Sequence, residues 1–301
     1  MLARLQQFTT LGLLAIATLW AAMAWHIGHP LRAMVGALLI VFGYALVLAI
    51  EFALLRRAHG DDPAPRATPA QLITAWWSEV RSAPRVFCWQ QPFRSRVWPD
   101  HLPADSKGRR GLLLVHGFVC NRGLWNPWLA RLRAAGVPYV AVNLEPVFGS
   151  IDDYMVLLED AVQRLERVTG VAPVAVAHSM GGLALRRWWA ERGDDARLHH
   201  AVTIASPHGG TWLARFAMTR NARQMRQRSG WLQTLAQREP ASRAARFTCF
   251  YGHCDNIVFP ASTATLAGAD NRHLAGVAHV HMASRPEPFD EVLRWLDLSP
   301  R

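Results

Sequence analysis

The chain has 301 residues, a hydrophobic content of 51% and a formal net charge of +11. This length allows one large domain or two small ones. Although the charge is strongly positive, no nucleic-acid-binding module occurs along the sequence, and we expect no nucleic-acid partner. A surface that faces anionic lipid explains the charge, and so does a solvated arginine-rich surface.

Two apolar segments begin the chain. They span residues 8–27 and 34–50 and are separated by a short turn. With its flanks, each reaches the roughly 20 residues that cross a bilayer. We therefore expect residues 1–58 to form a membrane anchor of two transmembrane helices. A cleaved signal peptide is the alternative for the first segment, but the second apolar segment follows at once, which favours a hairpin.

Arginines flank the two apolar segments unequally. Arg4 precedes the first segment and Arg56, Arg57 and Arg66 follow the second, whereas the connecting turn carries only Arg32. The positive-inside rule then places both ends of the hairpin in the cytoplasm, together with the large C-terminal domain. The expected location is a bacterial-type inner (plasma) membrane.

The rest of the chain alternates short apolar segments with amphipathic ones. Residues 59–84 are expected to form a proline-rich linker and a short helix at 71–81, and residues 86–90 an edge strand. We expect strands at 111–115, 139–143, 173–177, 201–205, 247–251 and 273–277. Helices are expected at 124–135, 152–168, 181–192, 262–266 and 288–296. This alternation predicts an α/β fold over residues 85–301, with helices on both faces of a mostly parallel sheet.

The segment 207–246 interrupts the alternation. It is long for a connection and mixes many arginines with tryptophan, leucine, phenylalanine and methionine. Such a mixture is typical of an interfacial helix or a lid. We expect a basic cap or lid here that packs over the sheet, and contact of this cap with anionic lipid is a second, compatible expectation.

Residues 177–182 have the sequence Ala-His-Ser-Met-Gly-Gly and lie between an expected strand and an expected helix. A serine in this setting is typical of a nucleophile elbow. Ala177 and Gly181 are the small neighbours that such a sharp turn needs. Ser179 is therefore the candidate nucleophile, and the N–H of Met180 at the helix N-terminus is a candidate oxyanion donor.

A serine nucleophile needs a base and an acid that orients the base. Asp255, in a loop after an expected strand, is the candidate acid, and His279, after the last expected strand, is the candidate base. His281 is the alternative base. A His-x-His pair can also bind a metal, but no third ligand with suitable spacing occurs, so we expect neither a metal nor a cofactor.

The expected strand at 111–115 is followed by His116, Gly117 and Phe118. Gly117 allows a close turn, and the N–H of Phe118 is the second candidate oxyanion donor. We expect His116 to support this loop by hydrogen bonding. His178, which precedes the candidate nucleophile, completes the set of supporting residues.

Together these segments resemble the α/β-hydrolase superfamily, and more narrowly the small bacterial triacylglycerol lipases and esterases, some of which also have alanine as the first small residue of the elbow. The resemblance rests on residues 116–118, 177–182, 205–211, 255–258 and 276–279. It covers the chain from about residue 110 onward, without the hairpin. It implies an α/β-hydrolase fold, a triad of Ser179, His279 and Asp255, and an oxyanion hole formed by Phe118 and Met180.

The sequence therefore predicts a membrane-anchored serine hydrolase, a carboxylesterase or lipase that acts on an acyl ester or a lipid through an acyl-enzyme on Ser179. A thioesterase, a phospholipase, an amidase or an acyltransferase would use the same residues, since a fold does not determine the substrate. A non-catalytic membrane scaffold that retains the fold is the alternative from a different class of protein.

Overall fold

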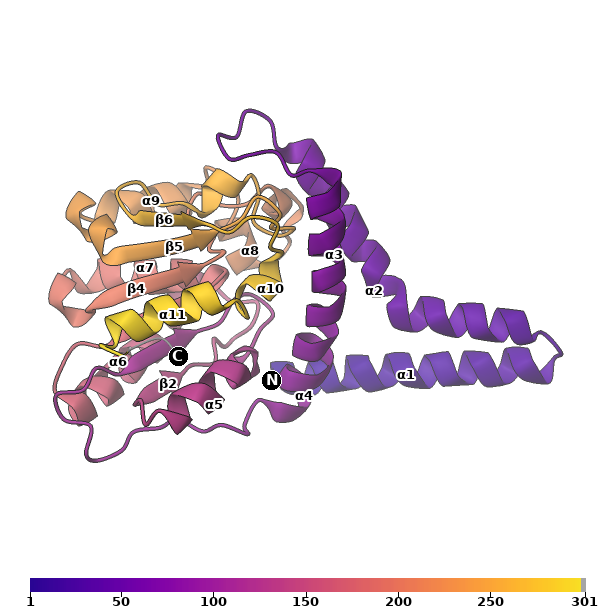
Figure 1. Cartoon of the computed structure of the whole chain (residues 1–301), viewed down its shortest axis with the longest axis horizontal. Helices are drawn as coiled ribbons and strands as arrows, with labels where there is room; N and C mark the ends of the chain where they lie inside the picture. Colours follow the sequence, from indigo (N-terminus) through magenta and orange to yellow (C-terminus); the bar gives the residue numbers. More distant parts are fainter. Residues whose placement is uncertain (299–301) are drawn as a thin grey trace.

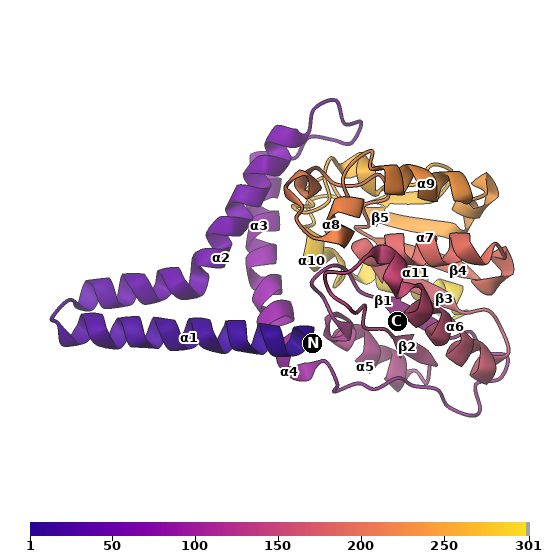
Figure 2. The same cartoon turned by 180° about the vertical axis from the view of Figure 1, so that it is seen from behind.

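Two long apolar helices project from an α/β domain in the computed structural model, which describes residues 1–298 (Figure 1). Helix α1 (Leu2–His26) and the first half of α2 (Pro30–Ala58) form a hairpin, and both helices are long and apolar enough to cross a membrane. The second half of α2 turns away from α1 and runs beside α3 (Figures 1 and 2). The expected helical hairpin is therefore present.

Helix α3 (Pro69–Pro84) crosses the edge of the α/β domain, at a steep angle to the hairpin (Figure 1). It begins with a capping box, in which Thr68 and Gln71 each accept a hydrogen bond from the other's backbone N–H. Two hydrogen bonds join it to α2, from Tyr44 Oη to the Val80 carbonyl and from Trp76 Nε1 to the Ala45 carbonyl. These contacts attach the base of the hairpin to the domain.

The expected edge strand at 86–90 is wrong. A π-helical turn (Arg85–Gln90) and α4 (Gln91–Arg94) continue α3 without a break. The two buried residues of the turn, Val86 and Gln90, are four positions apart, which is the spacing of one helical face. The segment also contacts α1, because the side-chain amide of Gln6 donates to that of Gln91 over 2.9 Å.

The sheet has six parallel strands in the order β2-β1-β3-β4-β5-β6. The strands are β1 (Leu112–Val115), β2 (Tyr139–Ala141), β3 (Val174–His178), β4 (His200–Ile204), β5 (Phe247–Tyr251) and β6 (Asp270–His273). The first five lie where the sequence predicts them. The last strand was expected at 273–277 but precedes that apolar segment, because the polar residues of β6 form the sheet edge and the apolar ones after them turn into the core.

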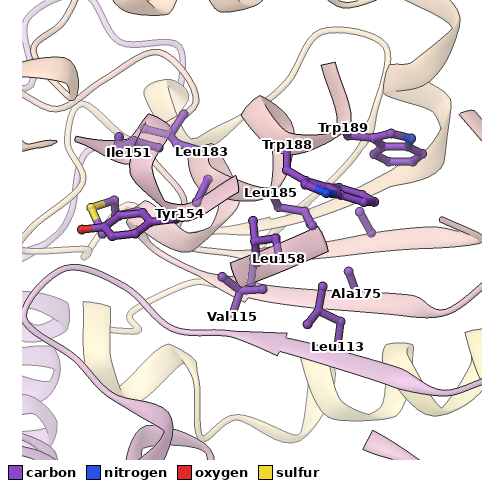
Figure 3. Packing of buried hydrophobic residues seen from close by; sticks show 14 of the residues in the cluster. Leu113, Val115, Ile151, Tyr154, Leu158, Ala175, Leu183, Leu185, Trp188 and Trp189 are labelled. Carbon is purple, nitrogen blue, oxygen red and sulfur yellow. The ribbon is translucent and has the colours of Figure 1, made fainter. Parts of the chain in front are cut away.

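Helices cover both faces of the sheet, as expected. Helices α5 (Asn126–Ala134) and α11 (Pro286–Trp295) cover one face, and α6 (Met155–Thr169) and α7 (Met180–Arg192) cover the other (Figures 1 and 2). Leu113 and Val115 of β1 pack against Leu158 of α6 and Leu183 of α7 (Figure 3). The helix expected at 262–266 is a single 3-10 turn (Ala261–Ala264).

The segment 207–246 contains the short helices α8 (Arg220–Gln224) and α9 (Gly230–Arg238) and two 3-10 turns, Trp212–Phe216 and Ala241–Arg246. Helix α9 packs against α7, on the same side of the sheet. Several arginines of the segment 207–246 form hydrogen bonds or ion pairs with other residues of this chain. Arg243 pairs with Asp195 over 2.6 Å, and Arg226 donates to the carbonyls of Ala214 and Ala217.

Candidate active site

Ser179 lies at the turn between β3 and α7 with φ 55° and ψ −131°. This left-handed backbone is strained for a residue with a side chain. The turn is held by a 2.8 Å hydrogen bond from the Ser179 N–H to the Ile204 carbonyl. A Cβ on Gly181 would lie 2.5 Å from the His116 carbonyl oxygen, so the elbow packs against the end of β1 only with glycine there.

The loop after β1 lies directly against the elbow. A Cβ on Gly117 would stand 2.7 Å from Ser179 Cβ, so this glycine permits the approach. Ala177 is fully buried in β3 and pairs with Val115 in register. The N–H groups of the two candidate oxyanion donors, Phe118 and Met180, make no backbone hydrogen bond within residues 1–298.

Asp255 and His279 lie together at the carboxyl edge of the sheet. His279 Nδ1 donates to both Asp255 carboxylate oxygens over 3.0 Å. The carboxylate is itself held, because Asp255 Oδ1 also accepts the backbone N–H groups of Ile257 and Val258. Because Nδ1 of His279 is bonded to Asp255, Nε2 is the ring nitrogen that can act as a base. Of the two candidate histidines, His279 contacts Asp255 and His281 does not, within the part of the chain described.

The charge around His279 favours its protonated form. Burial of the imidazole is the largest single influence and lowers its pKa, but the charge and hydrogen bond of Asp255, together with the charges of Glu79 and Glu51, outweigh burial, so that the pKa is raised. Ser179 and His279 line the same pocket, although no hydrogen bond joins their side chains among residues 1–298. Such bonds are often long in a free enzyme.

Two neighbouring histidines are neutral and support the site. His116 Nε2 accepts the Leu144 N–H over 3.0 Å, so its proton is on Nδ1, which donates to the Gly117 carbonyl. Burial lowers the pKa of His116 to about 4. His178 Nε2 donates to the His279 carbonyl over 3.2 Å, and burial holds its pKa well below the ordinary value.

A pocket of about 450 Å³ lies over these residues, and much of its wall comes from the N-terminal helices. Helix α2 contributes Tyr44, Val47, Leu48 and Glu51, and α3 with the π-helical turn contributes Glu79, Ala83 and Phe87. The segment expected to cap the site, 207–246, contributes Pro207, Thr211 and Met225. Most of the lining is apolar, which is typical of a site for an apolar ligand.

Glu51 and Glu79 are not among the site residues predicted from the sequence. The N-terminal region is predicted there as an anchor and a linker, and the first predicted site residue is His116. A signal was present in both cases. Glu51 directly follows an otherwise apolar segment, and Glu79 interrupts the apolar face that Leu72, Ala75 and Trp76 form on α3. An ionisable residue on an apolar face is costly unless it has a partner.

The sheet order, the covering helices and the serine turn after β3 define a hydrolase of the α/β type. The sequence profile of the alpha/beta hydrolase family matches residues 112–298, and the chain belongs to this family. The match confirms the predicted fold, and it leaves the hairpin and α3 outside its range.

Solved lipase structures share this fold. The mature form of the Bacillus licheniformis lipase BlEst2 superposes with a TM-score of 0.56 at 15% identity, over 64% of this chain and 95% of that chain. Lipase B of Aspergillus fumigatus gives a TM-score of 0.56 at 17% identity, over 69% of this chain and 57% of that chain. No curated protein sequence matches the chain.

Proposed function

We propose that the protein is a serine hydrolase that cleaves carboxylic ester bonds through an acyl-enzyme on Ser179. The observation that carries the proposal is that a serine on a strained turn and a histidine line one apolar pocket, and that a buried aspartate is bonded to this histidine.

In this mechanism Ser179 Oγ attacks the ester carbonyl carbon while His279 Nε2 takes the serine proton. Asp255 holds the Nδ1–H and stabilises the imidazolium that forms. The N–H groups of Phe118 and Met180 donate hydrogen bonds to the carbonyl oxygen and stabilise the negative charge that develops on it. His279 then gives its proton to the leaving alcohol, and water, activated by the same histidine, hydrolyses the acyl-enzyme.

The pocket supports a lipid or a long acyl ester as the substrate class. Its volume of about 450 Å³ and its apolar lining suit an acyl chain. Val47 of α2 lines the pocket and is also exposed. The pocket is therefore continuous with the apolar surface of α2 at this residue, and we propose that an acyl chain enters there.

The N-terminal helices are proposed to hold the enzyme at a membrane, with residues 1–58 as the anchor, 59–84 as linker and helix, and 85–301 as the hydrolase domain. The apolar side chains of α1 and α2 are largely exposed. Helix α3 and the turn after it also expose Ile73, Trp77 and Trp89, and tryptophan is favoured at the membrane interface. The arginine distribution supports a cytoplasmic domain and lipid contact by the cap.

Labelling with a fluorophosphonate tests the proposed function. The full-length protein in detergent should be labelled, and Ser179→Ala should not be. Ser284→Ala, which removes an exposed serine on the last loop, is the matched control and should be labelled like the wild type. A folded wild type that resists the probe would overturn the proposal, and a labelled Ser179→Ala variant would overturn the choice of nucleophile.

A further inference from the structure

The backbone after the last strand is held by side chains at three consecutive N–H groups. The His279 N–H donates to Asn256 Oδ1 over 3.3 Å. The Val280 and His281 N–H groups donate to the two oxygens of the Glu79 carboxylate over 2.9 and 3.1 Å. Both acceptors belong to other elements, so the position of the histidine segment depends on where those elements lie.

The first of these acceptors is tied to the N-terminal hairpin. Asn256 Nδ2 donates to Glu51 Oε2 of α2 over 2.7 Å. This bond orients the Asn256 amide so that its oxygen faces the His279 N–H. Glu79 on α3 thus contacts the histidine segment directly, and Glu51 on α2 acts on it through Asn256. Both helices lie outside the sequence range of the hydrolase family.

Glu79 is an unusual residue to find at its position. Its side chain is 1% exposed, and no lysine or arginine acts on it among residues 1–298. Burial raises its pKa to about 7, which reports the cost of placing a carboxylate there. An apolar side chain would fill this face of α3 more favourably. The contact that the carboxylate makes in return is the pair of N–H groups next to His279.

Two further polar groups of His279 are also occupied. Its carbonyl accepts from His178, and its Nδ1 donates to Asp255. Without Glu79, two N–H groups would be left without an acceptor inside the protein, and the segment would shift to find one. A displacement of about 1 Å at a catalytic group lowers a rate by about 10²-fold.

We propose that Glu79 and Glu51 are positioning residues for His279, so that α2 and α3 complete the active site as well as attach it to the membrane. This inference rests on the proposed function, because it assigns the two carboxylates to a base that must accept the proton of Ser179. It makes the hairpin and α3 a condition for full activity and not only an anchor.

Substitution of Glu79 in the full-length protein tests the inference. Glu79→Ala removes both acceptors and should lower kcat for p-nitrophenyl butyrate by about 10²-fold with little change in KM. Glu79→Gln has nearly the same shape and keeps one acceptor, so it should lose less. Glu191→Gln, which changes an exposed glutamate on α7, is the matched control and should keep the wild-type kcat.

A pH profile separates positioning from a purely structural role. The groups that face His279 are Asp255, Glu51 of α2, Glu79 of α3 and His178 at the end of β3. The charge of Glu79 raises the pKa of His279. Its loss in Glu79→Ala and Glu79→Gln should therefore move the ascending limb of the pH profile of kcat/KM to lower pH. Glu51→Gln should move the limb in the same direction.

The result that overturns the inference is a folded Glu79→Ala or Glu79→Gln variant with the kcat and the pH profile of the wild type. If Glu79→Ala does not fold, the Glu79→Gln and Glu51→Gln variants decide, since each keeps the size of the side chain. Failure of the proposed function is seen separately, as a wild-type protein that is not labelled at Ser179 by the fluorophosphonate.

Discussion

The hydrolase domain and the N-terminal hairpin contain similar apolar side chains but expose them in opposite ways. Leu114 in β1 is 0% exposed, whereas Leu39 in α2 is 66% exposed. Burial of a leucine from water contributes about 1.5–3 kcal/mol. The domain therefore obtains its stability from its own core, whereas the hairpin needs an apolar surrounding. The two regions nevertheless meet at the candidate active site, where Glu79 contacts the segment after β6 and Glu51 contacts Asn256 in the loop after β5.

The largest expected effect lies in the hydrolase domain. His279→Ala should lower kcat for p-nitrophenyl butyrate by about 10⁴-fold, because the candidate base is lost. His281→Ala should change kcat only a few-fold, since Nδ1 of His281 has no partner within residues 1–298 and its backbone N–H is retained. Circular dichroism would establish that both variants are folded. Equal losses of kcat would mean that His279 is not the base.

The contrast between the two regions can be measured with two leucines. Leu114→Ala should destabilise the domain by about 2–5 kcal/mol, because it opens a cavity in the sheet. Leu39→Ala should change the free energy of unfolding of the domain by less than about 0.5 kcal/mol, because its side chain does not contact the core. Urea unfolding in detergent, followed by tryptophan fluorescence, gives both values. A similar loss in both variants would mean that the hairpin shares the folding core of the domain.

The sequence was sufficient to predict the features that depend on local pattern. The apolar segments of β1, β3 and β4 and the small residues around Ser179 have periodicities and spacings that a strand and a sharp turn require. Strand β6 could not be found in the same way, because it is polar. The turn 85–90 was misassigned because its aromatic residues suit a strand, and the contact with α1 that keeps it helical involves a residue far away in the sequence.

The residues of the candidate site also differ in whether a local sequence pattern predicts them. Ser179, Asp255 and His279 follow strands, so their positions could be predicted from the strand order. Glu79 contacts a residue 201 positions away, and Glu51 one that is 205 positions away. Their roles depend on how α2 and α3 pack across the edge of the sheet, which no local pattern encodes.

A glycine pair tests how tightly the elbow is packed. Gly181→Ala should destabilise the domain by about 1–3 kcal/mol, because its Cβ would press on the carbonyls of Val115 and His116. Gly230→Ala, at the start of α9, has open space around the new methyl group and should leave stability unchanged or slightly raised. Thermal unfolding of the two variants provides the comparison. A Gly181→Ala protein as stable as Gly230→Ala would contradict the tight elbow.

The smallest expected effect is a shift in pH dependence. Burial opposes protonation of His279, but the carboxylate of Asp255 raises the pKa of the imidazole above its ordinary value of about 6.5. Because the base must be neutral to take the serine proton, kcat/KM should rise with pH through that raised pKa and then level off. In Asp255→Asn the residual activity should begin to rise at lower pH. An unshifted limb in this variant would show that His279 is not the titrating group.

The central claim is that Ser179 carries the acyl group. Rapid acid quenching of the full-length protein during turnover of a p-nitrophenyl ester, followed by peptide mass spectrometry, tests it directly. We expect the peptide that contains Ser179 to carry the mass of the acyl group in the wild type and to lack it in Ser179→Ala. In His279→Ala the acylated fraction of this peptide should be larger if deacylation is slowed more than acylation. Turnover that persists in Ser179→Ala, or an acyl group on a different residue, would contradict the account.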